Sequence, residues 1–140
     1  MNMERIANVW FTPDRIYIRT DADEIHSRPL EAFPILKEAS AAQREEYTIE
    51  MGGEALRWKA IDEDIHISSF YETTEPGTTN EVAAIFKRFP QLNVSEIARN
   101  IGINKSLLSK YIYGIKNPSD LRVVQIKDAL RALGKELATV

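Results

Sequence analysis

LNVSEIARNIGINKSLLSKYIYGIKNP, residues 92–118, predicts two short helices joined by a tight turn. Asn93 can cap the first helix, and Glu96, three residues later, would complete a capping box. Gly102 follows that helix at a position where a positive φ ends it and reverses the chain. The second helix is expected over 105–113, with Gly114 closing it. The stretch is therefore predicted to be a helix-turn-helix unit.

Apolar spacing assigns a buried face to each of these helices. Ile97 and Ile101 are four residues apart, and the second helix carries Leu108, Tyr111 and Ile112 at the matching interval. Ala98 is small enough to let the two helices approach closely. The second helix would then turn outward Ser106, Ser109, Lys110 and Tyr113, with Lys105 at its exposed start. Short polar and basic side chains suit a helix that enters the major groove of DNA.

The flanking segments are also predicted to be helical. Asn80 can cap a helix over 81–89 that Pro90 ends, Asn104 can cap the helix over 105–113, and Ser119 can cap a longest helix over 120–135. Gly134 should weaken the last turn of that helix. The region after residue 80 is thus expected to be all-α.

This half resembles the helix-turn-helix family of the lambda and Cro repressors. The resemblance covers about residues 80–135 and rests on the spacing of Ile97-Ala98, Gly102-Ile103, Leu108-Ser109, Gly114 and Pro118-Ser119. It implies an all-α five-helix DNA-binding domain in which 94–101 supports a recognition helix at 105–113. Position by position it implies DNA-binding residues Asn93, Asn104, Lys105, Ser106, Ser109, Lys110, Tyr113, Lys116 and Asn117.

Two positions depart from the family's pattern. Val94 stands where the family frequently has Gln, and Leu107 stands where Thr or Ser is common. Leu107 could meet a thymine methyl group or belong to the core. Both departures bear on base specificity rather than on the fold.

The first half predicts a small α+β domain with a mostly antiparallel sheet over residues 1–72. Expected strands are 6–11, 15–20, 24–28, 47–51, 56–58 and 65–67. Residues 29–46 look helical in two pieces, interrupted at Pro34 and restarted at Ser40 with Gln43 as capping-box partner. A last helical turn is expected over 68–72. TTEPGTTN, residues 73–80, is predicted to be a linker to the domain over 81–140.

The first half also resembles the bacterial family called domain of unknown function 2442, over about residues 5–72. LRWKAIDEDI, residues 56–65, carries the signature Trp and acidic run, and Pro29-Leu30-x-x-Phe33-Pro34-x-Leu36 matches as well. The family has no established activity, so the resemblance implies a fold and little more.

Composition and charge narrow the function classes. The chain has 140 residues and no cysteine, which excludes disulfides, thiolate catalysis and Cys-ligated zinc. No segment approaches the roughly 20 apolar residues of a membrane helix, and a cytoplasmic protein without membrane contact is expected. The net charge of −3 divides into +5 over residues 79–140 (ten basic against five acidic) and −8 over residues 1–78 (eight against sixteen). Local positive charge is what phosphate binding requires.

Candidate chemical sites are few. Asp62, Glu63, Asp64 and His66 could ligate a metal, but a solvated acidic turn explains them more simply, so no metal site is predicted. No catalytic spacing or cofactor motif is present, and neither an enzyme nor a cofactor is expected. Trp10, Trp58 and Phe33 could line a sensor pocket, although a core role is the simpler interpretation.

The sequence thus predicts a sequence-specific transcriptional regulator, of the repressor kind, that binds double-stranded DNA as a homodimer. The alternative is an antitoxin-like or adaptor protein that acts through a protein partner of its N-terminal domain.

Overall fold

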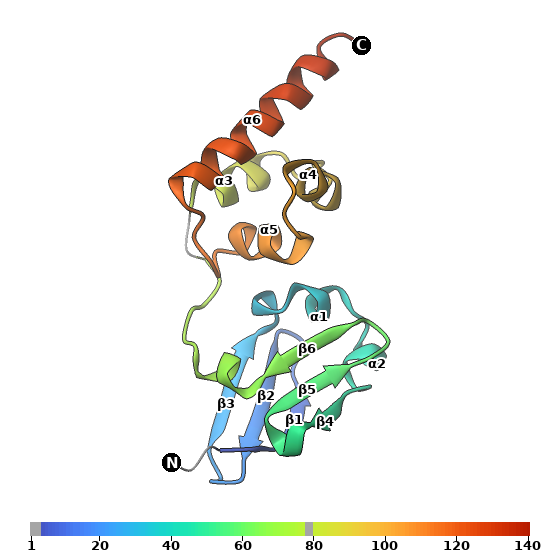
Figure 1. The fold of residues 1–140 in the computed structure, drawn as a ribbon, viewed down its shortest axis with the longest axis vertical. Helices are drawn as coiled ribbons and strands as arrows, with labels where there is room; N and C mark the ends of the chain where they lie inside the picture. Colours follow the sequence, from blue (N-terminus) through green and yellow to red (C-terminus); the bar gives the residue numbers. More distant parts are fainter. Residues whose placement is uncertain (1–3, 78–79) are drawn as a thin grey trace. The chain divides into compact units, whose positions relative to one another are not determined.

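The computed structural model describes residues 4–77 and 80–140. They form two compact units, an N-terminal unit over Met1–Glu75 and a C-terminal unit over Pro76–Val140. The first combines strands and short helices, and the second is helical (Figure 1).

The N-terminal unit begins with an antiparallel sheet of three strands, β1 (Ile6–Phe11), β2 (Arg15–Thr20) and β3 (Ile25–Pro29), in that order. In β2 the residues Ile16, Ile18 and Thr20 are buried while the residues between them are more exposed. This is the period of two that the sequence indicates, because successive side chains of a strand point to opposite faces.

A second antiparallel sheet comprises β4 (Thr48–Glu50), β5 (Ala55–Trp58) and β6 (Glu63–His66), also in sequence order. The expectation of one mostly antiparallel sheet was therefore too simple, since the six strands form two separate three-stranded sheets. Gly53, with a φ of 100°, lies where an added Cβ would be 2.7 Å from Arg5 Cβ, so only glycine lets this segment approach the start of β1.

Short helices connect the strands: the 3-10 turns η1 (Leu30–Ala32), η2 (Met51–Gly53) and η3 (Ile67–Tyr71), and the helices α1 (Pro34–Glu38) and α2 (Ala41–Arg44). Pro34 starts α1 rather than interrupting a helix, because proline fits the first helical position. The predicted capping box of Ser40 and Gln43 is confirmed.

The C-terminal unit contains α3 (Glu81–Arg88), α4 (Val94–Ile101), α5 (Lys105–Ile112) and α6 (Asp120–Leu137). Within residues 80–140 these are four helices, so the expected five-helix domain is corrected to four. α6 continues to Leu137, two residues beyond its predicted end at 135. One apolar core joins the four helices, formed by Val82, Phe86, Ile97, Ala98, Leu108, Tyr111 and Ile126.

Across the described residues, none of the helices combines the length and the apolar character needed to cross a membrane.

Candidate nucleic-acid interface

α4 and α5 pack together through the residues that the sequence assigns to their buried faces. Ile97 is 7% exposed, Ala98 1% and Leu108 0%. Gly102 follows α4 with a φ of 86°, and its amide donates to the Ala98 carbonyl at 3.0 Å. The left-handed glycine therefore reverses the chain between the helices, as the sequence predicts.

Asparagine caps both helix starts. The Oδ1 atom of Asn93 accepts the amide of Glu96 at 3.1 Å, and that of Asn104 accepts the amide of Leu107 at 2.7 Å. The Nδ2 groups of both caps make no hydrogen bond to the part of the chain described, so they can donate to an anion. The predicted reciprocal capping box at Asn93 is wrong, because the Glu96 carboxylate binds Arg99 Nη1 at 2.7 Å instead.

The other face of α5 carries polar side chains. Lys105 is exposed, and Ser106, Lys110 and Tyr113 are partly exposed. Ser109, predicted to face outward, is only 5% exposed because it follows Leu108 at the edge of the buried stripe. Leu107 packs partly buried against the core, which favours the core role over contact with a thymine methyl group.

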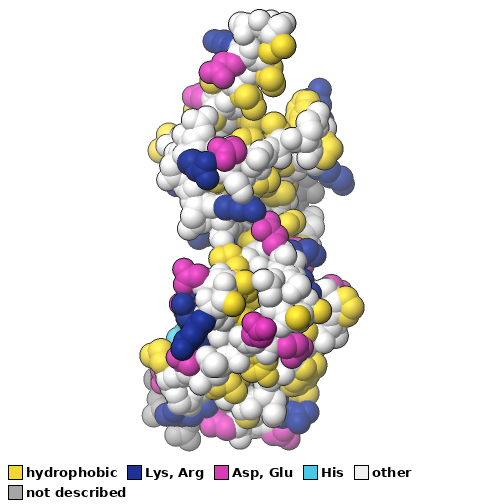
Figure 2. Space-filling view, turned by 90° about the vertical axis from the view of Figure 1, so that its right-hand side faces the viewer, with side chains coloured by type: hydrophobic (Ala, Val, Ile, Leu, Met, Phe, Trp, Pro, Cys, Tyr) yellow, Lys and Arg dark blue, Asp and Glu magenta, His cyan; other side chains and the backbone are white. Residues whose placement is uncertain are grey.

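Carboxylates of the C-terminal unit neutralise basic residues away from α5. Glu81 pairs with Lys127, Glu96 with Arg99, and Asp128 with Arg131. No carboxylate among residues 4–77 and 80–140 forms an ion pair with Lys110 or Lys116. In Figure 2, basic side chains lie at several places on the C-terminal unit, with hydrophobic side chains between them.

The loop after α5 is held against the end of that helix. The amides of Ile115 and Lys116 donate to the Lys110 carbonyl at 2.9 and 3.2 Å. Lys116 and Asn117 are exposed on this loop. Their side chains are thus presented next to the last turn of the predicted recognition helix.

In the acidic run at residues 62–64 of the N-terminal unit, two carboxylates form ion pairs with Arg57. Arg57 donates to Asp62 Oδ1 at 2.9 Å and to Asp64 Oδ2 at 3.1 Å, and the hydrogen bond to Asp62 raises the pKa of Arg57. Glu63 and Asp64 belong to β6 rather than to a turn. Asp62 and Asp64 are therefore ion-paired with Arg57.

The three singled-out aromatic residues differ in burial. Trp58 is 1% and Phe33 8% exposed, in agreement with the predicted core role. Trp10 is only half-buried, stacks on Tyr17 with ring centroids 5.6 Å apart, and lies under the Arg19 guanidinium.

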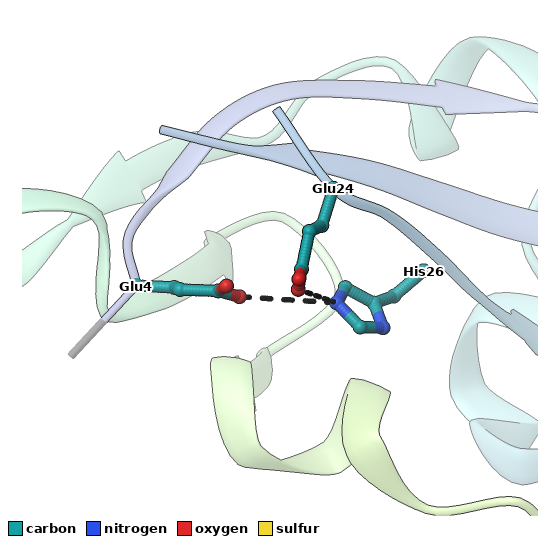
Figure 3. Close-up of side chains that lie close together, drawn as sticks. All are labelled: Glu4, Glu24 and His26. Atoms are coloured by element: carbon teal, nitrogen blue, oxygen red, sulfur yellow. Dashed lines mark hydrogen bonds and ion pairs between the residues drawn. The ribbon is translucent and has the colours of Figure 1, made fainter. Parts of the chain in front are cut away.

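Glu4, Glu24 and His26 form a cluster that was not predicted from the sequence. His26 Nε2 lies 3.3 Å from Glu24 Oε2 and 3.8 Å from Glu4 Oε2 (Figure 3). Glu24 immediately precedes β3 and His26 is its second residue, and a spacing of two in an extended chain places both side chains on one face. Glu4 precedes β1, and no local pattern connects it to the other two.

Tyr71 at the end of η3 borders this cluster. Its hydroxyl donates to Glu4 Oε2 at 2.8 Å, and its ring packs edge-on against His26 with centroids 4.8 Å apart. Loss of hydration, followed by the hydrogen bond to Glu4, raises the pKa of Tyr71 to about 12. The hydroxyl therefore remains a donor at neutral pH.

Comparison with known proteins places the N-terminal unit in a family. The family model described as "Protein of unknown function (DUF2442)" matches residues 6–75, which confirms the resemblance inferred for residues 5–72. No curated protein matches the chain. A similar solved structure is that of "Putative DNA Binding Protein NE0471 from Nitrosomonas europaea ATCC 19718", with 13% identity, coverage of 90% of this chain and 88% of that chain, and a TM-score of 0.37. The likeness of the C-terminal half to the lambda and Cro repressors stays a prediction.

Proposed function

We propose that this chain, which belongs to the DUF2442 family of proteins of unknown function, is a sequence-specific DNA-binding regulator of the repressor kind that reads DNA with α5. The observation that carries the proposal is the pairing of α4 and α5 about Ala98 and Leu108 through the left-handed Gly102. A helix supported in this way can lie in the major groove with its N-terminal residues against base edges.

The chemistry of each exposed group supports a role in that complex. Lys105, Ser106 and Lys110 would contact base edges and adjacent phosphates, because lysine and serine donate to both. The Nδ2 groups of Asn93 and Asn104 would donate to phosphates at the two helix starts, where the helix dipoles also favour an anion.

The remaining predicted contacts differ in how well the structure supports them. Lys116 and Asn117 on the exposed loop, together with Tyr113, would bind the DNA backbone. Ser109 needs a local side-chain movement to reach a phosphate, since it is 5% exposed. It is therefore the least supported member of the predicted set.

Homodimerisation is part of the proposal, because one recognition helix buries too little surface for tight specific binding. An apolar groove of about 360 Å³ runs between α3 and the C-terminal half of α6, lined among others by Ile85, Phe89, Leu130 and Leu137. Phe89 is 40% and Leu137 62% exposed, and α6 extends beyond the other helices of its unit (Figure 1). A second copy of the chain would cover this face.

The test is a titration of the purified chain against a duplex of its own upstream DNA and a scrambled duplex, at two salt concentrations. Lys110→Ala should weaken binding to the upstream duplex about 10-fold and reduce the salt slope by about 1, because one phosphate neutralisation is lost. Lys135→Ala removes the same charge from an exposed site on the last turn of α6 and serves as the matched control.

The outcomes distinguish specific DNA binding from attraction by net charge and from an adaptor function. Salt-sensitive binding that prefers the upstream duplex and is weakened by Lys110→Ala more than by Lys135→Ala supports the proposal. Equal loss in both variants, or equal binding of both duplexes, would mean that only net charge attracts DNA. Absence of binding at low salt would overturn the proposal and favour an adaptor that binds a protein partner through the N-terminal unit.

A further inference from the structure

The cluster of Glu4, Glu24 and His26 has the donor set of a metal site. Two carboxylates and one imidazole are ligands that divalent transition metals accept, and their combined charge of −2 balances that of the ion. All three ligand atoms lie within 4.8 Å of one another. Tetrahedral zinc with bonds of about 2.0–2.1 Å separates its ligands by about 3.3 Å, close to the 3.3 and 3.8 Å between His26 Nε2 and the two carboxylate oxygens.

Hydrogen bonds between the flanking segments hold Glu4 and Glu24 in place. The Arg5 amide donates to Asp21 Oδ1 at 3.1 Å, and the Asp21 amide donates to the Arg5 carbonyl at 2.9 Å. This reciprocal pair ties the residue after Glu4 to the turn that carries Glu24. The Thr20 amide donates to the Glu24 carbonyl at 2.9 Å, which closes the same turn. The two carboxylates therefore converge on the imidazole from different segments (Figure 3).

A second layer of contacts orients the ligands. Tyr71 donates to Glu4 Oε2 at 2.8 Å, and its ring packs against the His26 imidazole. Hydrogen bonds from outside the ligand set, like this one, fix the direction of a ligating carboxylate. Tyr71 thus contacts Glu4 and His26, whereas 56% of the Glu24 side chain is exposed.

An open pocket of about 440 Å³ adjoins the cluster. It is lined by the three ligands and by His66, Ser68 and Tyr71, among others. His66 Nδ1 accepts the Ser68 amide at 3.1 Å, which leaves the Nε2 atom of this second imidazole for another contact. The pocket provides an entry path and room for a water molecule as fourth ligand.

We infer that Glu4, Glu24 and His26 bind a divalent transition-metal ion of the Zn²⁺ type, with a fourth position open to the pocket. The ion would join the segment before β1 to the turn between β2 and β3, and would thereby stabilise the N-terminal unit. This site is independent of DNA binding by the C-terminal unit, so either proposal can fail alone.

The experiment is calorimetric titration of Zn²⁺ into the full, metal-stripped chain without an affinity tag. One ion per chain is expected, with a rise in thermal stability on binding. Glu24→Gln and His26→Ala should each weaken binding at least about 10-fold, and Tyr71→Phe should weaken it about 10-fold because the orienting hydrogen bond is lost. Glu46→Gln, which alters an exposed carboxylate outside the cluster, should leave binding unchanged.

Absorption spectroscopy adds a measurement that would not change if the three side chains served only to stabilise the fold. Co²⁺ in place of Zn²⁺ should give visible absorption bands of a tetrahedral site that His26→Ala abolishes. If His26→Ala does not fold, judged by the fluorescence of Trp10 and Trp58, the near-isosteric Glu24→Gln carries the test. No saturable Zn²⁺ binding, or binding unchanged in Glu24→Gln, would overturn the inference and leave an ordinary histidine–carboxylate pair.

Discussion

Each unit is stabilised by polar contacts within itself, and the two units differ in how far apart in sequence the contacting residues are. In the N-terminal unit these contacts join residues far apart in sequence: Arg28 Nη1 donates to the carbonyls of Glu72 and Thr74 at 3.0 and 2.7 Å, and Tyr71 binds Glu4. In the C-terminal unit each helix start is capped by a residue three positions from its partner, as at Asn104 and Leu107. The caps of the helical unit are thus local and one apolar core joins its helices, with a few long-range polar contacts such as that from Asn80 Nδ2 to the Tyr111 carbonyl at 2.8 Å. The first unit depends more on contacts between distant segments.

The largest effect is expected from Leu108→Ala in the C-terminal core. Leu108 is fully buried, so the lost methyl groups and the cavity should destabilise that unit by about 3–5 kcal/mol. Both tryptophans lie in the N-terminal unit, so their fluorescence reports its unfolding while far-UV circular dichroism reports mainly the helices. In a urea titration the helical transition should shift and the tryptophan transition should stay. Equal shifts of both transitions would show that the two units unfold as one. That result would contradict the view that different contacts stabilise each unit separately.

Arg28→Met tests the long-range contacts of the N-terminal unit. The Arg28 side chain is buried, burial lowers its pKa, and its Nε atom has no partner within the described residues. Loss of the two hydrogen bonds from Nη1 to backbone carbonyls should destabilise the unit by about 2 kcal/mol, partly offset by removal of the unpaired Nε group. The tryptophan transition in urea measures the effect, and Lys59→Met, which removes the same charge at an exposed position, is the control. If both variants behave alike, the segment 72–74 is not held by Arg28.

The smallest effect concerns the ion pair between Arg15 and Glu75. Arg15 holds the pKa of the Glu75 carboxyl below its ordinary value of 4.5. Because the folded pKa is depressed, the pair stabilises the unit fully above the ordinary pKa, and this contribution is lost as the pH falls below about 4.5. Glu75 is half exposed, so the contribution should stay under about 1 kcal/mol. Glu75→Gln should therefore lower stability slightly at pH ~7 and converge with the unchanged protein at pH ~3; a difference that persists at low pH would assign the effect to packing.

Most of the fold of the C-terminal unit could be predicted from the sequence, because its signals are local. The caps at Asn80, Asn93, Asn104 and Ser119 and the glycine after α4 lie where the pattern indicates them. The number of helices in the domain and the burial of Ser109 were not predicted correctly. The helix number was taken from a family resemblance. Ser109 lies at the edge of a helical face, where the helical period of 100° per residue does not decide whether a side chain is buried.

The two candidate sites also differ in how far they could be predicted from local sequence. The predicted DNA-binding residues lie on α5, its cap, its adjoining loop and the cap of α4, so their proximity follows from the local helix-turn-helix structure. In the metal cluster only the pair Glu24 and His26 has a local signal, the spacing of two on a strand. Glu4 joins them through the hydrogen bonds between Arg5 and Asp21, sixteen residues apart, which no local pattern encodes.

The amino-acid sequence by itself determined where each helix of the second half begins, where the turn between α4 and α5 falls, and which face of β2 is buried. Those features depend on φ, ψ and hydrogen bonds within about four residues. Only the tertiary structure decided that six strands form two sheets, that Arg28 is buried beneath the segment 72–74, and that Glu4 meets His26. The physical reason is that strand pairing and long-range contacts are selected by the packing of the whole unit, and the free energy of that packing belongs to no single segment.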